Sequence, residues 1–360
     1  MYKNILIVAG LCLVAALLFF LLGNTLVAGP LLVLFFIALA IGFRGYTALK
    51  GFAYTTTIFA AVTSALLYPH FFTEWNGFKL STLITPLIQL IMFGMGTSMS
   101  FKDFAGVVKM PKGVFIGVFS HFVIMPLLGF TLANLTNFPP EIAAGIILIG
   151  CSPNGMASNV ISYLAKANLA LSVTITAVST MLAPFVTPML MKLLAGAFVE
   201  IHTVDMMFDI FKMVIIPIGA GLVFNHFFHG KLKWLDDAMP LVSMFGIAFI
   251  IVIITAAGRE SLLTIGPALL LIVLIHNLCG YLLGYWSGRL FKMKERDCRT
   301  IAIEVGMQNG GLASGLAKAM GKMATVGLAP AIFGPLMNIT GSVLASYWHR
   351  KPVEDEIGEA

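Results

Sequence analysis

The chain has 360 residues, of which 59% are hydrophobic and only 11% are charged. A soluble domain carries about 25% charged residues, so a chain this apolar has too little polar surface to stay in solution. The 22 Lys and Arg and 16 Asp and Glu form no basic stripe interleaved with aromatic residues, which argues against nucleic-acid binding.

Long apolar segments separated by short polar loops run through the whole chain. Each is long enough to cross about 30 Å of hydrocarbon as a helix. We expect membrane spans near 5–22, 27–43, 54–71, 81–99, 113–134, 141–166, 170–195, 206–228, 238–257, 264–288, 299–321 and 325–348. The first run could instead be a signal peptide, but its apolar stretch is long and no small-residue cleavage site follows it cleanly.

The distribution of basic residues predicts the orientation of these spans, because Lys and Arg concentrate in cytoplasmic loops. If the N-terminus is cytoplasmic and the spans alternate, the outside loops hold only six of the 22 Lys and Arg: Lys79, Lys192, Lys212, Arg259, Lys318 and Lys322. We therefore expect a multi-pass protein of the cell (inner) membrane with both termini in the cytoplasm. Residues 349–360 would form a short cytoplasmic tail.

Two of the predicted spans are interrupted by residues that helices avoid. The first interruption reads IGCSPNGMASN at 149–159, and the second reads EVGMQNGGLAS at 304–314. Both contain Asn-Gly followed by a small-residue stretch that ends in Ala-Ser. The two stretches begin 155 positions apart, at 149 and 304, which is typical of an internal repeat.

The spans from 54 to 195 and those from 206 to 348 form two sets of five, and an odd number per set inverts the second copy in the membrane. The sequence thus predicts an all-α polytopic membrane protein with an added N-terminal helical pair (1–50), a first inverted repeat (54–195) and a second inverted repeat (206–348). Paired broken helices are typical of transporters, where freed carbonyls bind cations and half-helix N-termini face anions. The alternative is two glycine-kinked helices that pack closely and bind nothing.

Glu304 is the one acidic residue that we place deep in a span, and a carboxylate there needs a partner. A bound cation is the natural partner, because no Lys or Arg is expected at the same depth, and hard cations take oxygen ligands. Ser172 and Thr176 share one helix face, although such hydroxyls commonly bond their own helix. The other candidate oxygen donors are Ser158, Asn159 and Gln308 and the freed carbonyls of Val305 and Met307.

At these residues the chain resembles the bile acid:sodium symporter family, over about 54–348. The resemblance rests on IMFGMG at 91–96, on ASN at 157–159 through LAK at 164–166, on ALSV at 170–173 and on EVGMQN at 304–309. His276-Asn277 and the stretch NITGS at 338–342 also look like the family.

The resemblance implies a ten-helix unit with a panel domain and a core domain, and two broken helices that cross in the core. It implies a first sodium (Na+) site from Ser158, Asn159, Ser172, Thr176 and Glu304. It implies a second site from Glu304, Val305, Met307 and Gln308 with a glutamine on the helix at 113–134. Family substrates are organic anions, from bile acids to pyruvate and other carboxylates, and the substrate would lie near Asn309 and Asn338.

The chain departs from the family pattern at two site positions. His121 stands where the second sodium site has its glutamine, and Met156 stands where a threonine usually lies beside the substrate. Three roles stay open for His121: its neutral ring binds sodium, its protonated ring substitutes for the second sodium, or it bonds a neighbouring helix.

The sequence therefore predicts a sodium-coupled symporter that imports a small organic anion by alternating access, and not an enzyme. Proton coupling, alone or mixed with sodium, is the first alternative, and a cation–proton antiporter would be expected to carry further deep acids. An intramembrane enzyme built on Ser314 and His276 is the other, although no HExxH motif is present.

Overall fold

A computed structural model of the protein describes residues 2–46, 49, 52–100, 106–228, 233–351 and 353. This part of the chain is helical apart from a small hairpin of β1 (Glu74–Trp75) and β2 (Phe78–Lys79), which pair antiparallel. Eight of the described helical segments are long and apolar enough to cross a membrane. The prediction of an all-α polytopic membrane protein is thereby confirmed.

Every predicted span corresponds to helix in the structure. The helices are α1 (Tyr2–Leu21), α2 (Thr25–Phe43), α3 (Phe52–Leu67), α4 (His70–Thr73), η1 (Leu80–Leu83), α5 (Ile84–Thr97), α6 (Gly106–Lys109), α7 (Pro111–Leu135), α8 (Pro140–Cys151), α9 (Ala157–Leu164), α10 (Leu169–Ala195), α11 (Thr203–Ile210), the π-helical turn η3 (Phe211–Ile215), α12 (Ile216–Phe228), α13 (Lys233–Ala257), α14 (Arg259–Leu290), α15 (Glu295–Gly306), α16 (Gly310–Ala319) and α17 (Leu328–His349).

The bounds differ from the prediction where local chemistry decides them. The third span ends at Leu67, two residues before Pro69, because a residue that precedes proline disfavours the helical conformation. The span predicted at 264–288 extends to Arg259–Leu290. Parts of the predicted cytoplasmic loops (47–48, 50–51, 101–105 and 229–232) and most of the predicted tail at 349–360 lie outside the described residues.

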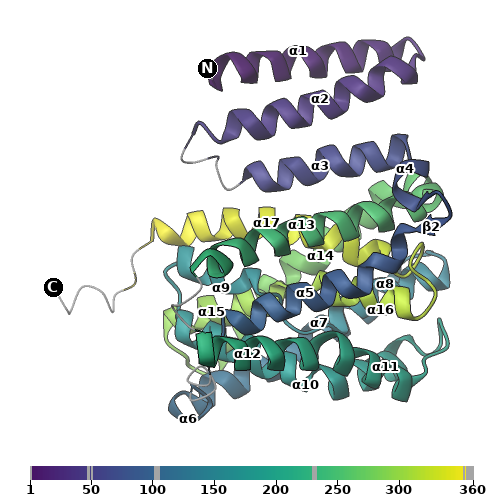
Figure 1. The fold of residues 1–360 in the computed structure, drawn as a ribbon. Coiled ribbons are helices and arrows are strands. Elements are labelled where there is room, and N and C mark those ends of the chain that lie inside the picture. Colours follow the sequence, from purple (N-terminus) through teal and green to yellow (C-terminus); the bar gives the residue numbers. More distant parts are fainter. Residues whose placement is uncertain are drawn as a thin grey trace.

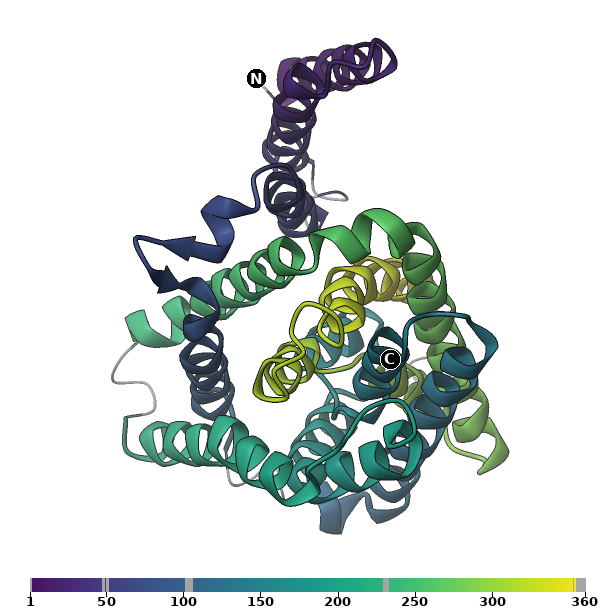
Figure 2. The same cartoon turned by 90° about the vertical axis from the view of Figure 1, so that its right-hand side faces the viewer.

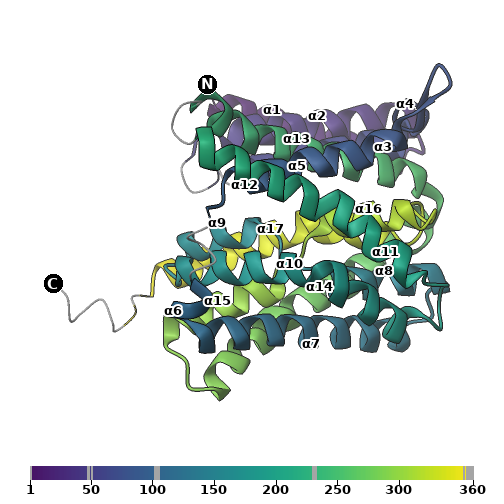
Figure 3. The ribbon, with the colours of Figure 1, turned by 60° about the horizontal axis from the view of Figure 1, so that its bottom comes forward.

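The helices form two layers. In the first layer α5 packs on α12 and α13, and α13 packs on α3. The second layer consists of α7–α10 and α14–α17, which pack among themselves around α8 and α15 (Figure 3). The panel and core domains, the inverted-repeat relation and the domain boundaries at 54–195 and 206–348 stay predictions.

The N-terminal pair lies outside both layers. α1 packs on α2, and α2 packs on α3. The pair therefore projects from α3 away from the rest of the bundle (Figure 2). Its outer faces carry exposed leucines, including Leu21, which is 82% exposed. Such a surface is stable in lipid, where apolar side chains need no cover. α1 begins and α17 ends at the same side of the bundle (Figure 1).

Close backbone packing between α5 and α12 holds the first layer together. A Cβ atom at Gly221 would lie 2.2 Å from the carbonyl oxygen of Phe93, and one at Gly96 would lie 2.2 Å from that of Ile218. Small residues at helix crossings let backbones approach in membranes, where no hydrophobic force drives helices together.

We expect Gly221→Ala to destabilise the protein by about 1–3 kcal/mol, because the added methyl group forces α5 and α12 apart. Thermal unfolding in detergent, followed by tryptophan fluorescence, should show a Tm several degrees lower. Gly219→Ala is the matched control on the same helix, because a Cβ there meets nothing within 4 Å. Equal Tm values for the two variants would contradict the packing argument.

Candidate cation site at two interrupted helices

Two helices of the second layer break where the sequence predicts. α8 ends at Cys151 and α9 begins at Ala157, and α15 ends at Gly306 and α16 begins at Gly310. Pro153, within the first break, has no N–H to continue a helix. At the second break the side chain of Asn309 caps α16, because its Oδ1 accepts from the N–H of Leu312 at 3.0 Å.

The two breaks cross and hydrogen-bond to each other. Asn154 and Gln308 lie directly opposite as an antiparallel pair. The N–H of Gly155 donates to the carbonyl of Met307 at 3.2 Å, and the N–H of Asn309 donates to that of Pro153 at 2.8 Å. Gly155 permits this approach, because a Cβ there would lie 2.7 Å from the carbonyl oxygen of Gln308. The crossing thus satisfies backbone groups that water does not reach.

Beside the crossing, the carboxylate of Glu304 is fully buried among oxygens from α9 and α10. Ser172 Oγ lies 2.5 Å from Glu304 Oε1, and Thr176 Oγ1 lies 2.9 Å from Glu304 Oε2. Asn159 Oδ1 lies 2.8 Å from the Ser172 hydroxyl and 3.3 Å from that of Thr176. The hydroxyl of Ser158 lies 3.4 Å from that of Thr176.

These oxygens come from the five residues that the sequence assigned to a first sodium site. The hydroxyls of Ser172 and Thr176 point toward this carboxylate and toward the side-chain oxygen of Asn159. The arrangement is one negative charge ringed by neutral oxygen ligands, which is the chemistry that a hard monovalent cation requires.

The residues assigned to a second site also meet, at the crossing itself. His121, Val305, Met307 and Gln308 are fully buried. His121 Nε2 lies 2.9 Å from the carbonyl oxygen of Ser152, and its Nδ1 lies 3.0 Å from Asn154 Nδ2. Gln308 Nε2 donates to the carbonyl of Val305 at 2.8 Å. The ring of His121 contacts both broken helices, because its Nδ1 also lies 3.2 Å from the carbonyl oxygen of Glu304 on α15.

A cavity of about 110 Å³ lies between the crossing and the first layer. The residues that the sequence placed beside the substrate, Met156, Asn309 and Asn338, all line it. Its first-layer wall is apolar, with side chains such as Ile91, whereas its second-layer wall includes the N-terminal ends of α9 and α16. No charged side chain lines it among the described residues, so the polar ends of these two helices are its source of positive potential.

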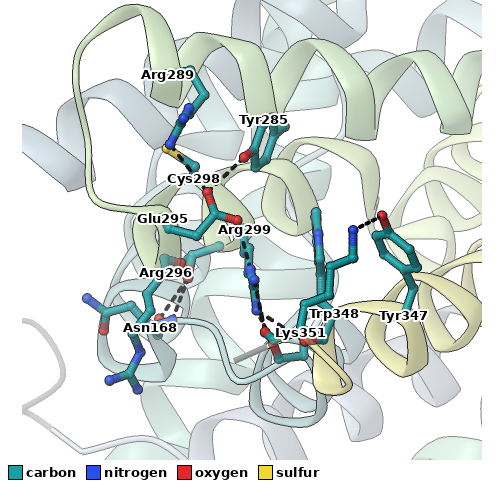
Figure 4. A network of polar contacts seen from close by, with 12 residues as sticks. Asn168, Tyr285, Arg289, Glu295, Arg296, Cys298, Arg299, Tyr347, Trp348 and Lys351 are labelled. Atoms are coloured by element: carbon teal, nitrogen blue, oxygen red, sulfur yellow. Dashed lines mark hydrogen bonds and ion pairs between the residues drawn. The ribbon is translucent and has the colours of Figure 1, made fainter. Parts of the chain in front are cut away.

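A polar network at one end of α15 fixes the helices that carry the site (Figure 4). Arg299 is 3% exposed and donates to the carbonyls of Ala165 at 3.5 Å, Trp348 at 3.2 Å and Lys351 at 3.2 Å. It also pairs with Glu295 at 3.0 Å. One guanidinium thus joins the ends of α9, α15 and α17.

Asn168 extends the network to α10. Its side chain caps α10 and donates to Asp297 at 2.8 Å, and its backbone N–H donates to the hydroxyl of Thr300 at 2.9 Å. Asn168 and Thr300 lie one helical turn before Ser172 and Glu304, so their contact sets the register in which the hydroxyl and the carboxylate meet. Sequence reasoning missed Asn168; its only local signal is an Asn directly before an apolar helical run.

Comparisons with known proteins show which family the chain resembles. Residues 85–265 match the model of the Sodium Bile acid symporter family. The chain is 42% identical over 292 residues to the uncharacterized sodium-dependent transporter YocS of Bacillus subtilis, covering 81% of this chain and 89% of that protein.

More distant relatives are similar over most of their length. The chain is 34% identical over 271 residues to the probable sodium/metabolite cotransporter BASS1, chloroplastic, of Arabidopsis thaliana, covering 74% of this chain and 68% of that protein. It is 34% identical over 244 residues to the ileal sodium/bile acid cotransporter of Oryctolagus cuniculus, covering 65% of this chain and 69% of that protein.

We expect Ser172→Ala and Thr176→Val each to weaken sodium binding about tenfold, which is about 1.4 kcal/mol, because each removes one oxygen next to Glu304. A cation that binds the folded state raises its stability with concentration, so sodium titrations of Tm against a potassium background measure the affinity. Ser179→Ala on the same helix is the control, because its hydroxyl bonds only the carbonyl of Thr176. A sodium response unchanged in all three variants would contradict the assignment.

Proposed function

The chain belongs to the sodium bile acid symporter family, and on that premise we propose that it imports a small organic anion, a carboxylate, together with sodium by alternating access. The family and the relatives named above are transporters and not enzymes. His276, which the enzymatic alternative pairs with Ser314, instead lies with its Nε2 2.9 Å from the carbonyl oxygen of Met125.

The observation that carries the proposal is the surroundings of Glu304. Every hydrogen bond that the structure describes for its carboxylate comes from a hydroxyl group. A buried carboxylate without a counter-charge is costly in a membrane, and sodium between Glu304, Ser158, Asn159, Ser172 and Thr176 supplies that charge. The site is therefore stable when sodium occupies it.

Sodium and substrate are coupled through this charge. With sodium bound, Glu304 is neutralised, and the N-terminal ends of α9 and α16 present a positive field to an anion in the cavity. Without sodium, the charged carboxylate of Glu304 repels an anion bound near Asn309, which lies five positions further along the same chain segment. The anion's carboxylate would lie near Asn309 and Asn338, and its apolar part would face Ile91 and its neighbours on α5 and α13.

The size and lining of the cavity support a small substrate with one carboxylate. A cavity of about 110 Å³ is far smaller than the 300–1,000 Å³ that drug-sized ligands need. Met156 places a thioether where a hydroxyl would give a further polar contact, so the substrate side facing Met156 is expected to be apolar.

We propose that the protein resides in the cell (inner) membrane with both termini in the cytoplasm, as the loop charges indicate.

We expect purified protein in liposomes to take up a small carboxylate only when a sodium gradient points inward, and Glu304→Ala to reduce this uptake to about 1% or less because the sodium site loses its only charge. Candidate carboxylates are first selected by thermal shift in sodium and in potassium. Glu74→Ala is the control, because this acid lies exposed in the β1–β2 hairpin.

Uptake driven equally well by a proton gradient in sodium-free buffer would contradict sodium coupling and favour the proton-coupled alternative. Normal sodium-driven uptake by a folded Glu304→Ala variant would contradict the role of the carboxylate. Folding of each variant is checked by its Tm and by gel filtration before reconstitution.

A further inference from the structure

A second cavity, which shares no lining residue with the cavity beside the crossing, lies where α7, α10 and α15 begin. Its volume is about 720 Å³. Four basic residues line it, Lys109, Lys112, Lys294 and Arg296, against one acid, Asp297. Such an excess of positive charge around a cavity predicts an anionic ligand.

The basic groups of this cavity are not neutralised by the protein. In the described part of the chain, no salt bridge or side-chain hydrogen bond involves Lys109, Lys112 or Lys294. The Nε of Arg296 is buried and has no hydrogen-bond partner there, although buried polar atoms are nearly always paired. The one acid is already engaged, because Asp297 accepts from the side chain of Asn168 at 2.8 Å. An anion in the cavity would therefore meet positive charge that no other group uses.

The first turn of α7 adds backbone donors to the same cavity. Met110 precedes this helix, and no side chain caps it. The first N–H groups of a helix have no partner within the helix, and the helix dipole favours a negative charge beside them. Pro111 has no N–H, so the available groups are those of Lys112 and Gly113, and both residues line the cavity. Lysine, arginine and helix N–H groups together are the donors that bind phosphate.

An apolar groove continues from the cavity along the lipid-facing side of the bundle. Pro111 belongs to both linings, and the groove, of about 430 Å³, runs between α7 and α10 past Phe122 and Leu182. The stretch of α7 from Pro111 to Val123 is about 18 Å long, close to the roughly 15 Å of hydrocarbon in one leaflet of a bilayer. Phe115 in this groove is 69% exposed, so the groove is open to surrounding lipid.

The cavity lies at the depth of lipid headgroups. α7 and α10 both begin beside it, and each is long and apolar enough to cross a membrane, so their first residues lie at the membrane surface. The loop charges place this end of the bundle in the cytoplasm, where anionic lipids attract basic residues. A soluble anion would occupy the cavity alone, whereas a phospholipid would occupy both the cavity and the groove.

From the cavity and the groove together we propose that this surface binds one anionic glycerophospholipid, with its phosphate among Lys109, Lys112 and Arg296 and one acyl chain between α7 and α10. Basic pockets between membrane helices at their cytoplasmic ends are suited to such headgroups. The phosphate lies beside Asn168 (Figure 4), whose backbone N–H bonds Thr300. The lipid thus joins the starts of α7, α10 and α15, and it stabilises the register of the two helices that meet at the buried carboxylate.

Lipid binding by the whole purified protein tests the proposal. Delipidated protein in detergent is titrated with phosphatidylglycerol, or with phosphatidylcholine of the same acyl chains, while native mass spectrometry counts bound lipids and Tm is followed. We expect one retained phosphatidylglycerol per chain and a Tm that rises with its concentration, with no comparable effect of phosphatidylcholine. Lys109→Gln/Lys112→Gln should weaken phosphatidylglycerol binding about thirtyfold, because each lysine beside an anionic lipid contributes to the affinity.

Matched variants separate the site from general effects of charge and surface. Lys79→Gln/Lys192→Gln removes the same charge from two exposed lysines outside the cavity, in β2 and in the last turn of α10, and should leave binding unchanged. Leu182→Trp fills the groove and should weaken binding about tenfold. Met189→Trp, on the same helix, 65% exposed and outside the groove, should not. All these positions are exposed, so folding is retained, and Tm without lipid checks it.

Equal binding of the two lipids, or unchanged phosphatidylglycerol binding in Lys109→Gln/Lys112→Gln, would overturn the proposal. Glycerol phosphate, which carries the phosphate without acyl chains, distinguishes a lipid from a soluble ligand. Equal protection by glycerol phosphate and phosphatidylglycerol at the same concentration, undiminished in Leu182→Trp, would assign the cavity to a soluble phosphate compound and overturn the lipid assignment. None of these measurements needs transport, so their outcome is independent of the sodium coupling proposed above.

Discussion

The structure depends on the burial of one carboxylate. The side chain of Glu304 is fully buried inside a membrane protein. Removing a carboxylate from water without an opposite charge beside it has a large free-energy cost. The surrounding oxygens reduce this cost only in part, because hydroxyl donors share a charge without cancelling it. In the proposed function sodium would relieve the remaining cost, so the feature that destabilises the empty site would also provide the free energy of cation binding.

The contacts of Glu304 with Ser172 and Thr176 require α10 and α15 to stay in register. The residues that fix this register lie away from the carboxylate. Ser172 and Thr176 come from one helix and Glu304 from another, and a shift of one residue would rotate either face by about 100°. Asn168 and Thr300 bond one turn below the carboxylate, and Arg299 ties the adjoining helix ends together. These bonds lie near one end of α15, α9 and α17, so the register of the helices is held by groups other than those around the carboxylate.

Local sequence information predicted the membrane spans and the helix breaks well. It predicted contacts between distant segments poorly. Hydrophobic length identified every long helix, and the Asn-Gly and Pro residues identified both breaks, because each signal lies within a few positions. The i, i+4 spacing of Ser172 and Thr176 placed them on one face, and the resemblance supplied their partner. By contrast, the contact of His121 with Asn154 joins residues 33 positions apart, and no periodicity indicates which amide atom the ring would bind.

The two half-helices at the crossing have different neighbours, and this asymmetry bears on how the site changes access. α16 packs on α8 and α17 within its own layer and also on α5, α11 and α13, whereas α9 packs on α10, α15 and α17 within its own layer. Beside α16, Lys318 donates to Thr85 at 2.8 Å, and Gly315 brings α16 against Ile88. The layers are thus joined at the α16 side of the cavity. The alternating access proposed above would require this junction to separate, and the hydrogen bonds between the two breaks would hold the crossing together during such a movement.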